Sequence, residues 1–428
     1  MHTFCSRYPA FKKCRGREWE TLPPITTLED IIMARFPPIP VMPQIDVLVG
    51  VPQNLIDGTP SIAFQRLEVQ DRTKLIRKCM NQLQCLKQED KATNKREQIA
   101  KLEIALANKL SKASVGNVED DIEQKLMRTQ QVKNSLFQFA GIAEQVVPTD
   151  DGTFQNDILL TIQQSNYFIS ALGDLRTRKK RQSLFLDKLP NEKWDTKSPI
   201  KYAFDSSLEK FERELVIQAL NQISSQTCIK FAFSNEQPKE PHLFYVKVAE
   251  SDTCGISYIG RVENVNPIYL SFACEEKVGI AIHETLHALG LGHQQLRVDR
   301  DEYVDVIWEN INPKLYDYFA LADSRKFTSY GVTYDYYSIM HYGPYIGGIN
   351  STTPTIVPKY QSERFLKVMG QRKSLSDKDV ELLTAMYCSE ECRDNNVYCG
   401  LWALKRLCNL PSQFIWMNNN CRKSCGLC

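Results

Sequence analysis

The sequence predicts an α+β protein in three parts: a largely helical leading segment, a domain that combines a twisted sheet with helices, and a small disulfide-rich module at the end. Apolar residues recur at helical spacing over about 67–112 and 120–146. An amphipathic stretch at 208–223 then precedes alternating apolar residues at 229–233 and 244–248, as expected of a helix packed on half-buried strands. Six cysteines fall within the last 37 residues, which are too few to bury an adequate core without disulfides.

Length and composition restrict the class of protein. A chain of 428 residues exceeds a usual single domain, and a prior of about 150 residues per domain suggests two or three. The 53 Lys and Arg residues nearly balance 51 Asp and Glu residues, so a net charge of +2 offers no field that would attract nucleic acid or an anionic membrane. Fourteen cysteines fit an oxidising compartment better than the cytosol, which predicts a secreted, extracellular protein.

The first residues have no recognisable export signal. Residues 1–50 contain no basic stretch followed by an apolar stretch of signal-peptide length. Residues 1–60 are rich in proline and without sustained periodicity, so we expect them to be irregular. The sequence contains no run of eighteen apolar residues, which is the length that would predict a membrane span. Either export uses another route or the natural start of the protein lies upstream of this sequence, and the cysteines favour the second alternative.

The helical stretches of the leading segment leave two questions open. Their apolar positions are Leu75, Met80, Leu83, Leu86, Leu102, Ile104 and Leu106. Helices of this composition either form a solvated arm or pack on another domain, and the spacing favours neither. In the same way, Cys79 and Cys85 can pair with each other or with Cys5 and Cys14.

The middle domain is expected to begin with a helix followed by strands. Asp205 or Ser206 can cap this helix, because both side chains accept hydrogen bonds from the free N–H groups at a helix start. Its apolar face would consist of Leu208, Phe211, Leu215, Ala219 and Ile223. Strands are expected at 229–233, 244–248 and 268–270, and residues 331–348, rich in Tyr and Gly, should form mostly loop.

Three of the six histidines lie in one eleven-residue stretch, HETLHALGLGH at 283–293. On a helix, His283 and His287 are four residues apart on one face, so both imidazoles can reach a single tetrahedral zinc ion. Glu284 then lies beside the metal without binding it, where its carboxylate can act as a general base. Gly290 can adopt the left-handed conformation that ends the helix and brings His293 to the same ion.

A second motif strengthens the zinc prediction. HExxH alone recurs by chance on surface helices whose histidines bind nothing. Here Gly290 and His293 follow at the right offsets, and residues 338–342 read SIMHY, which completes the extended metzincin pattern with its Met-turn. Of the other histidines, His341 is expected to be structural or exposed, and His242 to open a strand without a chemical role.

These motifs, together with RVDR at 297–300, resemble those of the astacin zinc endopeptidases, and the cysteine-rich tail resembles that of the nematode branch. The resemblance is strong over residues 182–428 and limited to short motifs before them. It implies a two-subdomain catalytic domain with one Zn²⁺ per chain, bound by the three histidines of the motif, and Glu284 as the general base. Tyr342 would be a further ligand that can swing off the metal and donate to the oxyanion, and Met340 would form the apolar floor of the site.

The resemblance also implies a latent form. Residues 154–157 read FQND, similar to the FxGD motif of the family, whose aspartate binds zinc in the precursor, so Asp157 would be the inhibitory ligand. A carboxylate in the open coordination position would displace the catalytic water. Asn156 replaces the glycine of that motif, although Asn is the residue after Gly that best tolerates positive φ. The alternative is an ordinary acidic residue at a strand edge.

A dense basic run, Arg178-Lys179-Lys180-Arg181, precedes the middle domain. A solvated linker or a nuclear-localisation patch would have the same composition. In a cysteine-rich exported chain, cleavage by a proprotein convertase after Arg181 is the better account, and Gln182 becomes the new terminus. The chain then divides into a pro-segment at 1–181, an astacin-like peptidase domain at 182–391 and a terminal module at 392–428.

The disulfide pairing is implied by the resemblance, since sequence alone permits many pairings. In the peptidase domain it implies the pairs Cys228–Cys388 and Cys254–Cys274. The last six cysteines, with Trp402, resemble a ShKT module, whose pattern implies Cys392–Cys428, Cys399–Cys421 and Cys408–Cys425. Toxin members block potassium channels with a Lys–Tyr pair, but the matching positions here are Ile415 and Trp416, so an accessory role in adhesion or substrate targeting is preferred.

The sequence therefore predicts a secreted zinc endopeptidase, made as a zymogen, that cleaves protein or peptide substrates of the extracellular matrix. Its rival is a non-catalytic, zinc-stabilised binding protein that acts through the ShKT module; loss of Glu284 or of a ligand would favour it, and none is lost. The sequon at Asn350 predicts a glycoprotein. Gln294 stands where the family usually has a Glu that binds the processed terminus, and an amide carries no charge, so we expect that terminus to dock neutrally or not at all.

Overall fold

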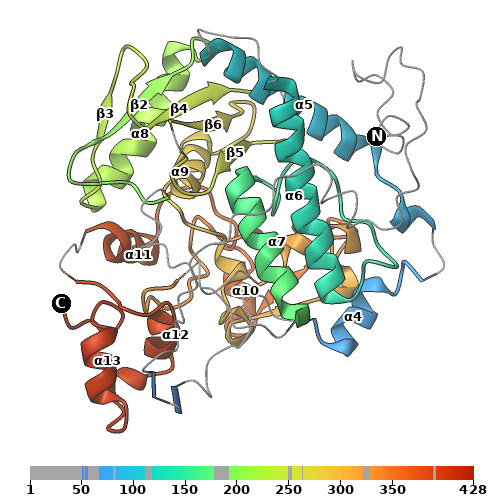
Figure 1. The fold of residues 1–428 in the computed structure, drawn as a ribbon, viewed down its shortest axis with the longest axis vertical. Helices are drawn as coiled ribbons and strands as arrows, with labels where there is room; N and C mark the ends of the chain where they lie inside the picture. The colour runs from blue at the N-terminus through green and yellow to red at the C-terminus, as the bar shows by residue number, and fades with distance from the viewer. Residues whose placement is uncertain are drawn as a thin grey trace. The chain divides into compact units, whose positions relative to one another are not determined.

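The computed structural model describes residues 51–52, 54–55, 67–80, 83–110, 118–177, 192–248, 253–262, 264–321, 328–388 and 392–428. The predicted cleavage site at Arg181–Gln182 lies outside these residues, as do Cys5 and Cys14. All the described residues belong to one unit that spans Gln44–Cys428. Along this unit, helices of the leading segment are followed by a mixed α/β domain and a helical terminal module, so the predicted α+β class is confirmed (Figure 1).

The leading segment is helical, but its helices differ in part from those expected. Its described helices are α4 (Val69–Ile76), α5 (Asp90–Leu110), α6 (Val118–Ala140) and α7 (Ile162–Thr177), with a 3₁₀ turn at Leu83–Leu86. The stretch at 67–112 is interrupted where Cys79 and Cys85 pair with each other, which answers the open question of their pairing. Met80 and Leu86 are 58% and 42% exposed there, so their assignment to an apolar face was wrong. Helix α7 was not predicted from the sequence.

These helices pack on the middle domain and do not form a solvated arm. Ile99 and Leu106 of α5 and Leu126 of α6 are buried in one apolar cluster with Phe244 and Tyr269 of the sheet. In Figure 1, α5 and α6 lie alongside the sheet and α7 runs next to α6, and α6 and α7 are in extensive contact. None of the helices among the described residues is long and apolar enough to cross a membrane.

The sheet of the middle domain includes one strand from the leading segment. Its strands are β1 (Ile158–Leu159), β2 (Ile200–Phe204), β3 (Phe231–Phe233), β4 (His242–Lys247), β5 (Gly255–Tyr258) and β6 (Val265–Leu270), in the order β1-β5-β6-β4-β2-β3. The β5–β6 pair is antiparallel and the other pairs are parallel. Strands β3, β4 and β6 were expected, whereas β2 and β5 were not. Helices α8 (Lys210–Gln226) and α9 (Lys277–Ala288) share a core with the face opposite α5.

Helix α8 begins later than predicted. Glu209 is its N-cap, and the Glu209 N–H donates to Glu212 Oε2 at 2.9 Å. Asp205 accepts a hydrogen bond from Ser207 N at 2.8 Å, so it caps a turn before the helix and not the helix itself. The buried face of α8 includes Val216, Ala219 and Ile223, whereas Phe211, which was placed in the core, is 63% exposed.

Beyond α9 the chain has short elements and long turns. They comprise β7 (Val304–Val306) paired with β8 (Ile356–Pro358), a 3₁₀ segment at Pro313–Tyr318, α10 (Ser362–Phe365) and α11 (Asp377–Tyr387). Residues 331–348 form turns, as the sequence predicted. The terminal module consists of α12 (Cys399–Leu404), a 3₁₀ turn at Leu407–Asn409 and α13 (Phe414–Asn420).

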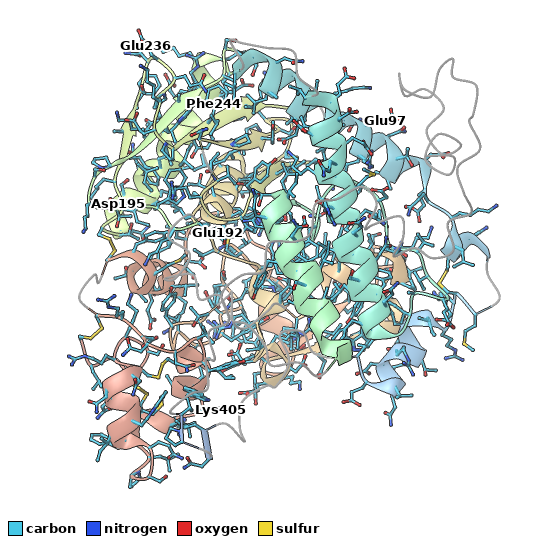
Figure 2. The ribbon with its side chains drawn as sticks, viewed as in Figure 1. Glu97, Glu192, Asp195, Glu236, Phe244 and Lys405 are labelled. Carbon is cyan, nitrogen blue, oxygen red and sulfur yellow. A yellow bond between two sulfur atoms is a disulfide. The ribbon has the colours of Figure 1, made fainter. Side chains whose placement is uncertain are left out.

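Disulfides join the ends of the middle domain and hold the terminal module together. The structure contains the five pairs that the family resemblance implies: Cys228–Cys388, Cys254–Cys274, Cys392–Cys428, Cys399–Cys421 and Cys408–Cys425 (yellow bonds in Figure 2). The module also docks tightly on the middle domain, because Trp402 is fully buried in the same core as Met386. A Cβ on Gly331, whose φ is +79°, would lie 2.6 Å from Ser424 O, so glycine permits this close approach.

Candidate metal centre

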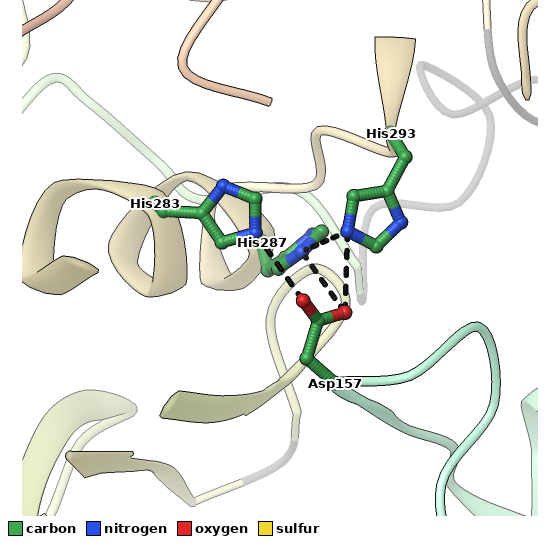
Figure 3. Close-up of side chains that lie close together, drawn as sticks. All are labelled: Asp157, His283, His287 and His293. Carbon is green, nitrogen blue, oxygen red and sulfur yellow. Dashed lines mark hydrogen bonds and ion pairs between the residues drawn. The ribbon is translucent and has the colours of Figure 1, made fainter. Parts of the chain in front are cut away.

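Helix α9 and the turn that ends it bring the three histidines of the motif together. His283 and His287 lie one turn apart on α9, where every residue from 279 to 288 is buried. The helix ends at Ala288, and Gly290 adopts a φ of +99°, which a residue with a Cβ rarely takes. Gly290 N donates to His287 O at 2.8 Å, and the chain then returns so that His293 faces the other two rings (Figure 3).

Backbone carbonyls orient two of the rings. The Nδ1 atom of His283 bonds Ile339 O at 2.9 Å, and that of His287 bonds Leu291 O at 2.8 Å. These bonds assign the ring proton to Nδ1 and leave the Nε2 lone pairs facing inward. Burial, followed by the charge of Arg372, lowers the pKa of His283 to about 4. Both effects favour neutral imidazole, which is the form that binds metal.

Asp157 of the leading segment completes the cluster. Its Oδ2 lies 3.4 Å from His283 Nε2, and its Oδ1 lies 3.2 Å from His293 Nε2 and 3.7 Å from His287 Nε2 (Figure 3). Burial alone would raise the pKa of Asp157, but His293 and the other imidazoles hold it well below its usual value. The cluster therefore combines three imidazole nitrogens with one carboxylate.

The donor atoms fit a zinc ion. One ligand atom from each of these four residues lies within 4.8 Å of all the others. His287 Nε2 and His293 Nε2 approach to 3.2 Å, while Asp157 Oδ1 and His283 Nε2 are buried without a hydrogen-bond partner. Buried polar atoms without partners are costly unless a cation joins them, and three nitrogens with one oxygen form a usual zinc ligand set.

Glu284 follows the first histidine and lies beside the cluster. Its Oε2 atom is buried without a hydrogen-bond partner, and burial, followed by the charge of Asp157, raises its pKa well above the usual value. Gly255 of β5 makes room for this side chain, since a Cβ there would lie 2.3 Å from Glu284 Oε1. Gly255 was not predicted as a site residue, although a glycine inside a strand often marks such a close approach.

Asp379 of α11, which was not predicted as a site residue, stabilises the Met-turn. Asp379 accepts hydrogen bonds from Ser338 Oγ at 2.6 Å and from Ile339 N at 2.9 Å. Ile339 is the residue whose carbonyl orients His283, so Asp379 acts on the metal centre through the turn. Met340 is 2% exposed and belongs to the main apolar core of the middle domain.

Tyr342 contacts the leading segment in this structure. Its hydroxyl donates to Gln155 O, and its ring centroid lies 4.4 Å from that of His293. Burial, followed by the charge of Asp157, raises the pKa of Tyr342 well above its usual value, so the hydroxyl remains a donor. The side chain is therefore adjacent to the histidines with its hydroxyl turned toward the loop that carries Asp157.

That loop has an unusual backbone, stabilised by contacts on both sides. Asn156 has a φ of +80°, in line with the tolerance expected of Asn, and Gln155 has a φ of +52°, which was not expected. Gln155 N donates to Asp317 Oδ2 at 3.0 Å, and Lys95 Nζ of α5 donates to Asn156 O at 2.8 Å. These bonds offset the cost of two consecutive residues in left-handed conformations.

A cavity of about 710 Å³ adjoins Glu284 and is lined by both basic and acidic side chains. Arg372 lines it together with Lys367 and Lys373. Arg372 Nη1 donates to His341 O and Gln371 O, both at 3.1 Å, and none of the described carboxylates forms an ion pair with it. His341 itself is fully buried and bonds Tyr334 Oη at 2.7 Å, which makes it structural and rules out the exposed alternative.

Comparison with known proteins agrees with the fold and the site, which together define a zinc metallopeptidase. Residues 186–388 match the family model for the astacin peptidases, and residues 391–428 match that for ShK domain-like modules. Zinc metalloproteinase nas-10 of Caenorhabditis elegans is 40% identical over 99% of this chain and 81% of its own length. Zinc metalloproteinase nas-9 of the same nematode is 36% identical over the same shares of the two chains. The chain belongs to the astacin family of zinc metalloendopeptidases.

A solved structure is also similar. High choriolytic enzyme 1, a hatching enzyme zinc-protease from the medaka fish Oryzias latipes, is 29% identical, with 45% of this chain and 92% of that chain covered and a TM-score of 0.40. The prediction of a zinc-dependent endopeptidase with a ShK-type module is thus confirmed by the family and by the two nematode relatives.

Proposed function

We propose that this chain is the precursor of a secreted zinc endopeptidase, kept latent by Asp157. The observation that carries the proposal is the carboxylate of Asp157 at 3.2–3.7 Å from all three imidazole Nε2 atoms. A ligand from the leading segment in this position occupies the site that the attacking water needs. Removal of the leading segment after cleavage by a proprotein convertase at Arg181 would vacate it.

Each group near the centre has a role that its geometry supports. His283, His287 and His293 would hold the Zn²⁺, which when bound supplies Lewis-acid polarisation of the scissile carbonyl. Glu284, with one oxygen free of protein hydrogen bonds, would take the proton of the attacking water and deliver it to the leaving amine. Tyr342, once released from Gln155 O, would donate its hydroxyl hydrogen bond to the developing oxyanion.

The edge of β5 supports a mode of substrate binding. In the precursor this edge pairs with β1 through Ile158 and Leu159, and Ser257 N donates to Asp157 O at 3.0 Å. An extended peptide would pair with the same edge by backbone hydrogen bonds once β1 has left. This mode reads extension more than one side chain, which suits proteins of the extracellular matrix as substrates.

Disulfides support secretion, and an exposed sequon supports glycosylation. The described residues include six disulfides, which fit an oxidising compartment. Asn350 of the sequon is exposed, and its Oδ1 accepts a hydrogen bond from Thr352 Oγ1 at 3.0 Å. In the ShK module, Ile415 is 75% exposed, which favours an apolar docking contact over channel block.

A peptidase assay with and without chelator tests the proposal. The precursor and the fully processed protein would each be given a mixture of quenched fluorescent peptides. We expect hydrolysis only from the processed protein, and its loss when a chelator removes the zinc. Zinc-loaded processed protein that is silent toward all peptides would favour the rival, a zinc-stabilised binding protein.

A further inference from the structure

We infer that the leading segment remains bound to the peptidase domain after the chain is cut at 178–181, and that the severed segment is a second-stage inhibitor. The inference rests on the proposed zymogen function. The severed segment would bind the edge of the peptidase sheet, the face of the sheet that α5 covers, and the 3₁₀ segment at Pro313–Tyr318. Activation then needs a further event, such as a second cut within the severed segment.

The inhibitory loop is internal to a helical pair, so a cut near 181 does not free it. Asp157 lies between α6 and α7, which pack extensively against each other. On its far side, Gln164 of α7 donates from Nε2 to Ile259 O of the peptidase domain at 2.7 Å, and both atoms are buried. Helices α5, α6 and α7 and the loop that carries Asp157 all lie before residue 178, so a cut at 178–181 leaves them joined to one another.

A buried carboxylate of α5 bonds the outer face of the sheet. Glu103 accepts hydrogen bonds from the hydroxyls of Tyr258 on β5, at 2.6 Å, and of Tyr269 on β6. Lys125 of α6 forms an ion pair with the same carboxylate. Burial alone would raise the pKa of Glu103, but Lys125 and the two hydroxyls hold it below the usual value, so the buried group is charged. Separation of the two parts would break a charge-assisted network that water must then replace.

A second charged contact joins α6 to the 3₁₀ segment at Pro313–Tyr318. Lys133 of α6 is fully buried, with its Nζ 2.8 Å from Asp151 Oδ1 and 3.7 Å from Asp317 Oδ2 of the peptidase domain. Burial alone would lower the pKa of Lys133, but the two aspartates raise it above its usual value. Lys314, from the same 3₁₀ segment as Asp317, donates to Lys87 O at 2.9 Å.

Apolar burial joins these polar contacts into one interface. Phe137 of α6 contacts Tyr316 with ring centroids 5.6 Å apart, and both belong to a core that spans the two parts of the chain. On the sheet, Phe244 (Figure 2) and Tyr269 are covered by α5 and α6. If the severed segment dissociated, it would expose this apolar surface, and contiguous apolar patches of that kind are rare on soluble monomers. We therefore expect these contacts to hold the severed segment in place without the covalent link.

A precursor with a site for a sequence-specific protease in place of residues 178–184 tests the inference. After complete cleavage, the sample would be passed over a gel-filtration column at a series of dilutions and assayed for peptide hydrolysis. We expect both fragments to elute together and hydrolysis to stay at the level of the uncut precursor. A second protease that digests the severed segment should then release the activity.

Glu103→Gln is the sensitive variant and Glu97→Gln its matched control, because Glu97 lies exposed on the same helix (Figure 2). Loss of the buried charge should raise the concentration at which the cut fragments separate by roughly tenfold to a hundredfold, while the control matches the parent. Fragments of the parent that separate at once, with hydrolysis in step with the cut, would overturn the inference and leave the zymogen proposal intact. An uncut precursor as active as the separated peptidase fragment would instead overturn the zymogen proposal.

Discussion

Gly255→Ala adds one methyl group to the metal centre and should act on Glu284 alone. A Cβ at this position would lie 2.3 Å from Glu284 Oε1, 2.5 Å from Cγ and 2.6 Å from Cδ. Carbon atoms approach favourably only at about 3.5–4.0 Å, so the whole side-chain end of Glu284 must move by about 1 Å. The backbone itself accepts alanine, because Gly255 is not in the left-handed region and lies in strand β5.

The size of the effect follows from the displacement. A misplacement of about 1 Å in a catalytic group costs about a hundredfold in rate, which corresponds to about 2.7 kcal/mol of transition-state stabilisation. His283 and His287 are oriented by the carbonyls of Ile339 and Leu291 and not by β5, so zinc content should not change. The expected result is a kcat/KM about a hundredfold lower with one zinc per chain.

The assay compares fully processed variants on one quenched peptide and measures zinc by elemental analysis. Gly343→Ala is the matched control, because a Cβ there would meet nothing within 4 Å. The double variant Gly255→Ala with Glu284→Gln should be no worse than Glu284→Gln alone, since both changes remove the same proton transfer. A Gly255→Ala enzyme within threefold of the parent, or one that loses its zinc, would refute the reasoning.

Three further predictions concern single side chains. Glu284→Gln should retain one zinc per chain and lose about 10²–10⁴-fold in kcat, because the histidines bind the metal and the carboxylate moves the proton. Zinc analysis and peptide hydrolysis check this prediction, and a fully active variant would exclude the role of Glu284 as general base. Arg372→Ala should lower kcat/KM roughly tenfold for peptides whose acidic side chain reaches Arg372 in the cavity beside Glu284, and leave their neutral counterparts unaffected in a paired-peptide assay. An equal loss for both would assign the arginine a structural role. Gln294→Glu should raise neither turnover nor melting temperature in the processed enzyme, because a terminus at Gln182 that has cyclised offers no charge; a gain of several degrees with faster turnover would show that a charged terminus reaches this position.

The sequence by itself determined those features that depend on neighbours within a few residues. The spacing of His283 and His287 places both rings on one helix face, and Gly290 ends that helix whatever surrounds it. Alternation likewise predicted β3 and β4, and the family resemblance implied the same disulfide pairs that the structure contains. Local geometry and covalent chemistry act before any long-range contact forms, so these signals can be recognised in a single sequence.

Only the tertiary structure determined the features in which a side chain contacts residues far away in the sequence. Asp205 is a good helix cap by local rules, but in the folded chain it pairs with Lys109, 96 residues away, and the helix begins at Lys210 instead. Asp157 reaches the histidines only because β1 joins the edge of β5, and no local pattern specifies that pairing. Gly255 and Asp379 act on groups far along the chain for the same reason. Burial and long-range hydrogen bonding depend on where the whole chain goes, and this is the physical limit of what the sequence pattern could predict.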